Sequence, residues 1–368
     1  MYVPIMKVRA EEKKVSKKLR YCFSEKIIPL YEILKDSYET RYKTDEQGNF
    51  VMELKPGAKR RNKIKLSPTE EDLITLEELN LDGAVAFIDF FRFEADAYGG
   101  NKIDINQVEL AYKLSRDEEE YINRLKSISS YENFIPVISL KNNFTFNRSK
   151  LISLIKELKL ENNCIALRIE DKVFDSVKEV VEEYLDEEDY LLYDIKEQNI
   201  DSKVMEIYEL NECDIKSKKI LLNSPRKAKL KNSEYENCEK SILIDNSVVD
   251  EYQDYEFDGF GDYGGLKDQL PTTGGGNGKG AALGLVYNFE ENAFYSFCNY
   301  DTNLGMGGYI KVIDDILKFE HKLNSDGKCP FYKEVNKRKL EKRGGSWATW
   351  NNLTLTKYIY EIYLSIKK

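Results

Sequence analysis

Histidine is almost absent from this chain of 368 residues, and His321 is its single example. Catalysis by imidazole, as in a Ser-His-Asp triad or a histidine-based phosphodiesterase, needs that side chain at the reaction centre. His321 falls in residues 310–323, a stretch with the pattern of an amphipathic helix, well past the strand-like segments described below. We therefore expect His321 to lie on a helix face, and histidine chemistry is excluded as the basis of function.

Paired cysteines and membrane-spanning segments are lacking as well. The six cysteines lie far apart and form no C-x-x-C pair, which excludes zinc-ribbon spacing and favours reduced, structural thiols. No apolar run reaches the roughly 18 residues of a membrane-spanning helix, and the first residues do not have the pattern of a signal peptide. We expect a cytoplasmic protein with no membrane partner.

The sequence also contains no match to the Walker A motif of phosphate-binding glycine loops. The cluster Gly274–Gly280 contains Gly278-Lys279, which is suggestive of a Walker A loop. Thr273, however, stands where that motif needs its first glycine, and Gly280 stands where Ser or Thr must follow the lysine. A flexible connector is the better interpretation of this segment.

Eight short apolar runs are present, and most are separated by polar stretches with helical patterning. They end, in chain order, at Lys7, Glu32, Asp89, Lys141, Asp171, Asp194, Ser224 and Asp245. Continuous apolar runs of this length suit strands buried on both faces, as in a parallel sheet. Strand and helix alternating about eight times predict an α/β fold of the (β/α)₈ TIM-barrel-like type. A tyrosine- and glycine-rich run over 255–263 competes with the run ending at Asp245 as the strand that closes the barrel.

The chain is about a hundred residues longer than a typical barrel of roughly 250 residues. The pattern breaks between Leu34 and Leu81, which predicts an insertion of about 34–81 after the second strand. After residue 263 the character changes to a glycine-rich segment, a hairpin pattern and two amphipathic helices. We expect a barrel domain over 1–263 and a C-terminal α+β extension over 264–368 that packs on it.

Charged residues at the strand ends form the candidate site, because these ends line the functional mouth of such barrels. The candidates for catalysis are Glu32, Asp89, Asp194, Lys141 and Arg168, and those for ligand binding include Lys7 and Glu170. Carboxylates can hold a hard cation such as Mg²⁺, whereas Lys and Arg can hold phosphate. The alternative is that these side chains only face water and form ion pairs.

A basic run lies within the insertion. Lys55–Lys65 contains six Lys or Arg in eleven positions, and Lys59, Arg60, Arg61 and Lys63 are the candidate nucleic-acid contacts. The run has no interleaved aromatic residue, which argues against a platform for stacking single-stranded bases. A solvated loop is the alternative interpretation.

Three stretches resemble the Beta-protein family, which is found in phages and bacterial defence islands. They are YVPIMK with Glu11-Glu12 and the downstream PLYEI, the tract DGFGDYGG (Asp258–Gly265), and GGSWATWNNLTLTKYIYEIY (Gly344–Tyr363). The resemblance implies a TIM-barrel-like fold, a role in phage–host conflict, and functional positions at Asp262 and Tyr263 in addition to the strand ends. Relatives often carry a histidine pair near the end of the closing motif, where this chain has Lys357-Tyr358. We therefore interpret the closing motif, with Trp347 and Trp350, as structural.

Two functions of different classes follow from these observations. One is a sensor or scaffold of a conflict system that binds a ligand or a protein partner from the same operon, with nucleic acid or a nucleotide as further candidates. The other is a metal-assisted phosphodiesterase or nuclease acting at the barrel mouth. The near absence of histidine and the lack of a D-x-D motif favour the first.

Overall fold

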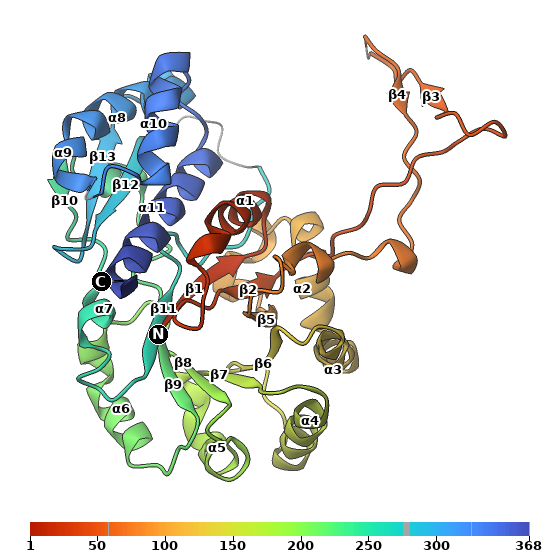
Figure 1. Cartoon of the computed structure of the whole chain (residues 1–368), viewed down its shortest axis with the longest axis vertical. Helices are drawn as coiled ribbons and strands as arrows, with labels where there is room; N and C mark the ends of the chain where they lie inside the picture. Colours follow the sequence, from red (N-terminus) through yellow and green to blue (C-terminus); the bar gives the residue numbers. More distant parts are fainter. Residues whose placement is uncertain (58, 275–279, 325, 368) are drawn as a thin grey trace.

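Eight parallel strands form a closed barrel in the computed structural model, which describes residues 1–57, 59–274, 280–324 and 326–367 (Figure 1). The order around the barrel is β1, β2, β5, β6, β7, β8, β9 and β11, and β11 pairs with β1. Their bounds are β1 Tyr2–Lys7, β2 Leu30–Ile33, β5 Ala86–Phe90, β6 Phe134–Leu140, β7 Ala166–Glu170, β8 Tyr190–Asp194, β9 Lys218–Leu222 and β11 Gly259–Asp262. The predicted (β/α)₈ architecture is confirmed.

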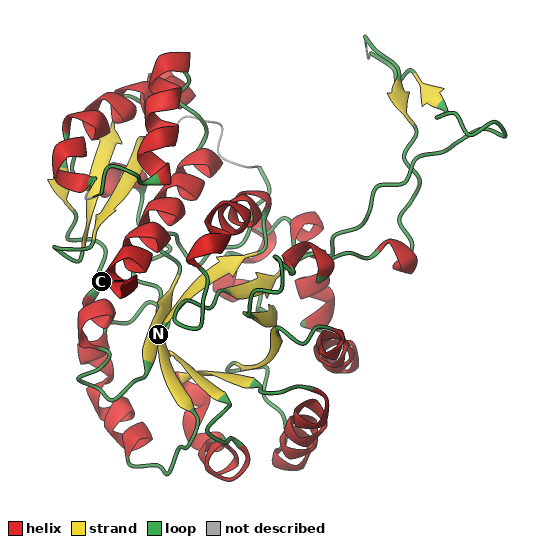
Figure 2. Ribbon diagram, in the orientation of Figure 1, coloured by secondary structure: helices red, strands yellow, loops and turns green. Residues whose placement is uncertain are grey.

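Burial of both strand faces explains the continuous apolar runs. Every residue of β1 and of β6 is buried, because one face fills the barrel and the other contacts the surrounding helices (Figure 2). The helices of the barrel are α1 Ala10–Leu19, α2 Glu109–Leu114, α3 Glu118–Lys126, α4 Arg148–Glu161, α5 Lys178–Tyr184, α6 Val204–Asn211 and α7 Ser247–Glu251.

The closing strand is β11, so of the two competing segments the run over 255–263 closes the barrel, and Ser241–Asp245 does not. Only the preceding pair Glu239–Lys240 forms a strand there (β10), and it pairs with a strand of the C-terminal extension. Glycine explains why β11 can lie between β9 and β1. A Cβ on Gly261 would lie 2.5 Å from the carbonyl oxygen of Val3 in β1. A side chain at this position would force the two strands apart, so the barrel closes where the sequence has glycine.

The insertion after β2 forms an arm, residues 38–73, that projects away from the barrel (Figure 1). Tyr38 pairs with Leu73 at its base, and two-residue strands, β3 Met52–Glu53 and β4 Asn62–Lys63, pair antiparallel farther out. Among the described residues from Glu39 to Glu71, none is buried. The arm therefore contributes little to the core of the barrel.

The chain after β11 passes over the barrel mouth and then forms an α+β extension beside the barrel (Figure 1). Its sheet has the order β10, β13, β12, with β12 Ala282–Asn288 and β13 Ala293–Asn299. Its helices are α8 Gly308–Lys318, α9 Glu320–Leu323, α10 Pro330–Glu341 and α11 Trp347–Lys367. α11 contacts both β12 and α1, and one continuous apolar core contains barrel residues such as Val3 and extension residues such as Tyr358.

Three further expectations concern the rest of the chain. Within the described ranges, no helix combines the length and the apolar character that crossing a membrane requires. All six cysteines are free thiols. The glycine-rich connector expected over 274–280 falls mainly in 275–279, outside the described residues.

Candidate functional site

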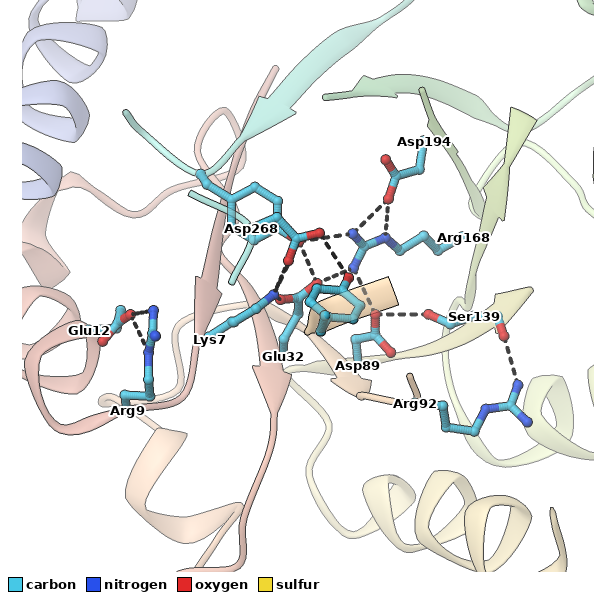
Figure 3. Close-up of polar contacts among 12 residues, drawn as sticks. Lys7, Arg9, Glu12, Glu32, Asp89, Arg92, Ser139, Arg168, Asp194 and Asp268 are labelled. Atoms are coloured by element: carbon cyan, nitrogen blue, oxygen red, sulfur yellow. Dashed lines mark hydrogen bonds and ion pairs between the residues drawn. The ribbon is translucent and has the colours of Figure 1, made fainter. Parts of the chain in front are cut away.

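The carboxyl ends of the barrel strands bring most of the predicted site residues together. Strand register aligns Lys7 of β1 with Glu32 of β2, and Glu32 with Asp89 of β5. Arg168 of β7 and Asp194 of β8 approach from the other side of the mouth, and Figure 3 shows the side chains converging. The barrel therefore concentrates both signs of charge at one point.

The guanidinium of Arg168 is the centre of this group. Its Nη1 donates hydrogen bonds to Glu32 Oε1 at 2.7 Å and to Asp89 Oδ2 at 2.9 Å. Its Nε and Nη2 both donate to Asp194 Oδ2, at 3.0 and 2.7 Å. Because a guanidinium carries five N–H donors in one plane, a single arginine can bind three carboxylates. Arg168 thereby links four strands of the barrel: β2, β5, β7 and β8.

The ammonium of Lys7 forms a second centre beside the first. Its Nζ lies 2.5 Å from Glu32 Oε2 and 2.6 Å from Asp268 Oδ1. The hydroxyl of Tyr263 donates to Glu32 Oε1 at 2.8 Å, and the hydroxyl of Tyr98 donates to Asp268 Oδ2 at 2.9 Å. We refer to the connected set as the mouth network: Lys7, Glu32, Asp89, Arg168, Asp194, Tyr263 and Asp268.

The mouth network is buried, whereas one expectation for strand-end charges was exposure to water. Exposed fractions run from 0 % at Glu32 and Asp89 to 8 % at Asp268. A second apolar cluster covers it, which we call the mouth cover: Leu34, Phe91, Phe93, Ile103, Val108, Ala111 and Leu270. The ring centroid of Phe91 in this cover lies 4.5 Å from Lys7 Nζ. The charges are therefore stabilised by one another and not by solvent.

Mutual pairing keeps the buried groups ionised. Burial opposes ionisation of Glu32, but the charges of Lys7 and Arg168 outweigh it and hold the pKa of Glu32 below its usual range. Burial also opposes ionisation of Asp194, where Lys196 and Arg168 prevail and lower the pKa to about 2. Burial likewise disfavours the charged form of Arg168, yet Asp194 foremost among its anionic neighbours raises the pKa of Arg168 well above its ordinary value. Lys7 and Arg168 do not by themselves balance the four carboxylates of the network, and Lys196, whose Nζ lies 3.4 Å from Asp194 Oδ2, adds a third cation at its edge.

Lys141 lies at the end of β6 and differs from the other cations of the mouth. Within the described residues its Nζ has no carboxylate at ion-pair distance, and it donates instead to the carbonyl oxygen of Arg92 at 2.8 Å. It also lies 3.8 Å from the ring centroid of Phe91. Burial foremost, and then the like charge of Lys196, lower the pKa of Lys141 to about 7. Oδ1 of Asp89 is a buried acceptor that has no hydrogen-bond partner in the described part of the chain.

The carboxylates do not form the donor set that Mg²⁺ would need. Glu32, Asp89 and Asp194 converge on the guanidinium of Arg168, which takes the central position between them. Among the described residues, no group of three or more His, Cys, Asp or Glu side chains is placed to hold a metal ion. The residue types suit a hard cation, but their arrangement suits arginine.

Two of the predicted ligand-binding residues lie outside the mouth network. Glu170 Oε1 lies 3.1 Å from the ammonium of Lys196. Asp262 accepts hydrogen bonds from the hydroxyl of Tyr358 in α11 at 2.6 Å and from that of Tyr2 in β1 at 3.2 Å. Burial raises the pKa of Asp262 to about 6. Asp262 thus joins β1, β11 and α11, whereas its neighbour Tyr263 points into the mouth.

Sequence reasoning missed several polar residues of the mouth. Lys196 and Arg92 each come two positions after the end of a strand, and Ser139, inside β6, donates to Asp89 Oδ2 at 2.8 Å. Asp268 follows β11 by six positions, in a segment whose composition is typical of a connector. A search that extended a few residues beyond each strand end would have found Lys196 and Arg92. Asp268 has no such signal, because its place depends on the path of the chain across the mouth.

The basic residues of the insertion lie elsewhere. Lys59, Arg60, Arg61 and Lys63 are all exposed residues of the arm. Figure 1 shows the arm projecting away from the barrel, so these residues and the mouth network form two separate features of the molecule.

Comparison with known proteins identifies no relative. No protein-family model, no curated protein and no solved structure matches this chain. The mouth network and the arm are therefore the features on which a functional inference can be based.

Proposed function

We propose that this chain is a binding component of a bacterial or phage conflict system, which acts as a sensor or scaffold with a charged site at the barrel mouth. The sequence resemblance to the Beta-protein family supplies the biological context, and a protein encoded in the same operon is the expected partner. The confirmed barrel fold is compatible with this role and does not by itself select it, because barrels carry many functions.

The observation that carries the proposal is the pairing of the mouth charges beneath the mouth cover. Lys7 and Arg168 engage Glu32, Asp89, Asp194 and Asp268, and all six side chains are at most 8 % exposed. Hydrolysis assisted by a metal needs carboxylates that are free to bind a cation and an open coordination position. The arrangement found here favours binding over the alternative of a phosphodiesterase or nuclease.

Lys141 is the residue through which the mouth would sense a ligand. It is a buried amine without a carboxylate partner in the described part of the chain, and it contacts Phe91 of the mouth cover. An anionic group placed beside Lys141 would favour its charged form and would have to displace Phe91. Binding of a small anion, such as a phosphate or carboxylate group, would in this way be converted into movement of the cover.

A phage-challenge experiment tests the proposal. The chain is expressed with the neighbouring genes of its operon, and we expect protection from phage and co-purification of a partner protein with the tagged chain. Lys141→Met should abolish protection without unfolding the barrel, whereas Lys156→Met, which removes an exposed lysine from α4, should leave protection intact. Absence of both protection and a partner would contradict the proposal. Cleavage of a phosphodiester substrate by the purified chain with Mg²⁺ would support the enzymatic alternative.

A further inference from the structure

The outer part of the arm concentrates positive charge on a chain that is acidic as a whole. Residues 41–65 contain eight Lys or Arg and three Asp or Glu, a net charge of +5, whereas the complete arm, residues 38–73, carries +1 because four further acidic residues lie at its base, and the complete chain carries −9. Arg41 pairs with Asp72, and Lys55 lies 3.8 Å from Glu53. The other described basic side chains of this stretch form no ion pair with described residues: Lys43, Lys59, Arg60, Arg61, Lys63 and Lys65. Uncompensated positive charge on a projecting ribbon attracts polyanions.

Aromatic rings lie beside this charge, although the basic run itself contains none. Antiparallel pairing within the arm brings Tyr42 and Phe50 next to Lys63, whose Nζ lies 3.4 Å from the ring centroid of Phe50 and 5.2 Å from that of Tyr42. The two rings contact each other edge to face, with centroids 5.8 Å apart. Phe50 is 48 % exposed. An exposed ring beside a cation is an arrangement that can stack an unpaired base in proteins that bind single strands.

The arm also packs against no other described part of its own chain. Its regular ladder consists of only two residues in each strand, and its described residues from Glu39 to Glu71 include none that is buried. Met52, Leu54 and Leu66 are between 45 and 59 % exposed. A two-stranded hairpin is marginally stable in water by itself. Contact with a second molecule would therefore order the arm as well as bury its apolar side chains.

From these observations we infer that the arm is a binding site for single-stranded nucleic acid. Lys59, Arg60 and Arg61 contact backbone phosphates, and Phe50 stacks a base while Lys63 lies beside the ring. The phosphates of a duplex can reach the same basic residues, but its bases are already stacked on one another and cannot pack on Phe50. The arm therefore prefers a single strand. This inference does not depend on the function proposed for the barrel mouth.

Fluorescence anisotropy with the complete chain tests the inference, using a labelled 20-nucleotide oligo(dT) and a duplex of the same length in 50–200 mM KCl. The triple substitution Lys59→Ala/Arg60→Ala/Arg61→Ala should weaken single-strand binding by at least about tenfold at the lowest salt. The slope of log affinity against log salt should fall by about 2, since each phosphate contact on a single strand contributes about 0.7. Phe50→Ala should weaken binding about tenfold with an unchanged slope, because it removes stacking and no charge.

A matched control removes three positive charges elsewhere. Lys333, Lys337 and Arg343 are exposed residues in or just after α10, and their joint replacement by Ala should leave affinity and salt slope unchanged. The arm side chains are exposed, so thermal unfolding of the arm variants should match the parent chain. If the triple variant of the arm and the triple variant of α10 lost affinity for the single strand equally, the attraction would be non-specific and the inference would be overturned. Unaltered binding by the arm triple, or a duplex bound as tightly as the single strand, would overturn it as well.

Discussion

Replacing Arg168 by Met should destabilise the barrel strongly, because it removes the cation on which three buried carboxylates depend. Glu32 would still have Lys7 and the hydroxyl of Tyr263. Asp194 would still have Lys196, whose Nζ is 3.4 Å away and whose backbone N–H donates at 3.0 Å.

Asp89 would have the least compensation. After the loss of Arg168, its only remaining hydrogen bond from a described residue comes from the hydroxyl of Ser139. Breaking a buried ion pair by removing one partner costs about 3–5 kcal/mol, and we expect a loss of stability in this range near pH 7.

Urea unfolding followed by circular dichroism measures this effect. Arg148→Met is a matched control, since Arg148 is half exposed in its pairs with Glu179 and Glu183 and should cost less than about 1 kcal/mol. Asp89→Asn in the Arg168→Met background should recover a large part of the stability, because the amide oxygen still accepts from Ser139 and carries no charge. If Arg168→Met unfolds at nearly the same urea concentration as the parent, or if Asp89→Asn restores nothing, the mouth charges are solvated and our account of them is wrong.

Three other substitutions should also give measurable changes. The pKa of Lys141 is lowered in the folded chain to about 7, so above that pH the unfolded chain binds more protons and stability rises from about pH 7 to 10. Lys141→Met should flatten this rise and should increase stability at pH 6 by about 1–4 kcal/mol. Urea unfolding across this pH range measures both effects. The pKa of Asp262 is raised to about 6, so the folded chain binds more protons than the unfolded chain, and stability falls as pH rises from about 4 to 6. This fall should be absent from the same pH series with Asp262→Asn. A fall that persists in the variant would belong to another titrating group. Gly261→Ala places a Cβ 2.5 Å from a backbone oxygen of β1 and should lower the melting temperature or prevent folding. Gly307→Ala meets no atom of a described residue within 4 Å and should melt like the parent.

Much of the barrel could be predicted from the sequence because its strands are buried on both faces, and this produces short continuous apolar runs. Seven of the eight runs end at or close to the end of a barrel strand. Hydrophobicity does not identify the eighth strand, since Gly259–Asp262 has little apolar surface and is a strand because glycine permits close pairing with β1. Ser241–Asp245 has the more apolar sequence, but no strand of the barrel pairs with it.

The charged residues of the mouth were predictable from the strand ends, but their burial and their partners were not. Residue types at strand ends do not say whether carboxylates face a metal, water or an arginine, and here Arg168 takes the central place. Burial of the network depends on Phe91 and Leu270, which belong to segments without a regular pattern. The rings beside Lys63 were missed for a related reason: Phe50 is thirteen positions away along the chain and becomes a neighbour only through hairpin pairing.

The position of β1 between β2 and β11 affects how the chain folds during synthesis. Tyr2 pairs with Phe260, and the barrel cannot close until more than two hundred and fifty further residues have left the ribosome. Until then β1 and β9 both present unpaired edges, which invite pairing with other chains. Tyr358 of α11 donates a hydrogen bond to Asp262 of β11, which also accepts one from Tyr2 of β1. The last helix therefore stabilises the pairing of the first barrel strand with the last. We expect ribosome-bound chains that stop before β11 to be sensitive to proteolysis and to recruit chaperones, and the protection of β1 from hydrogen exchange to appear only after release.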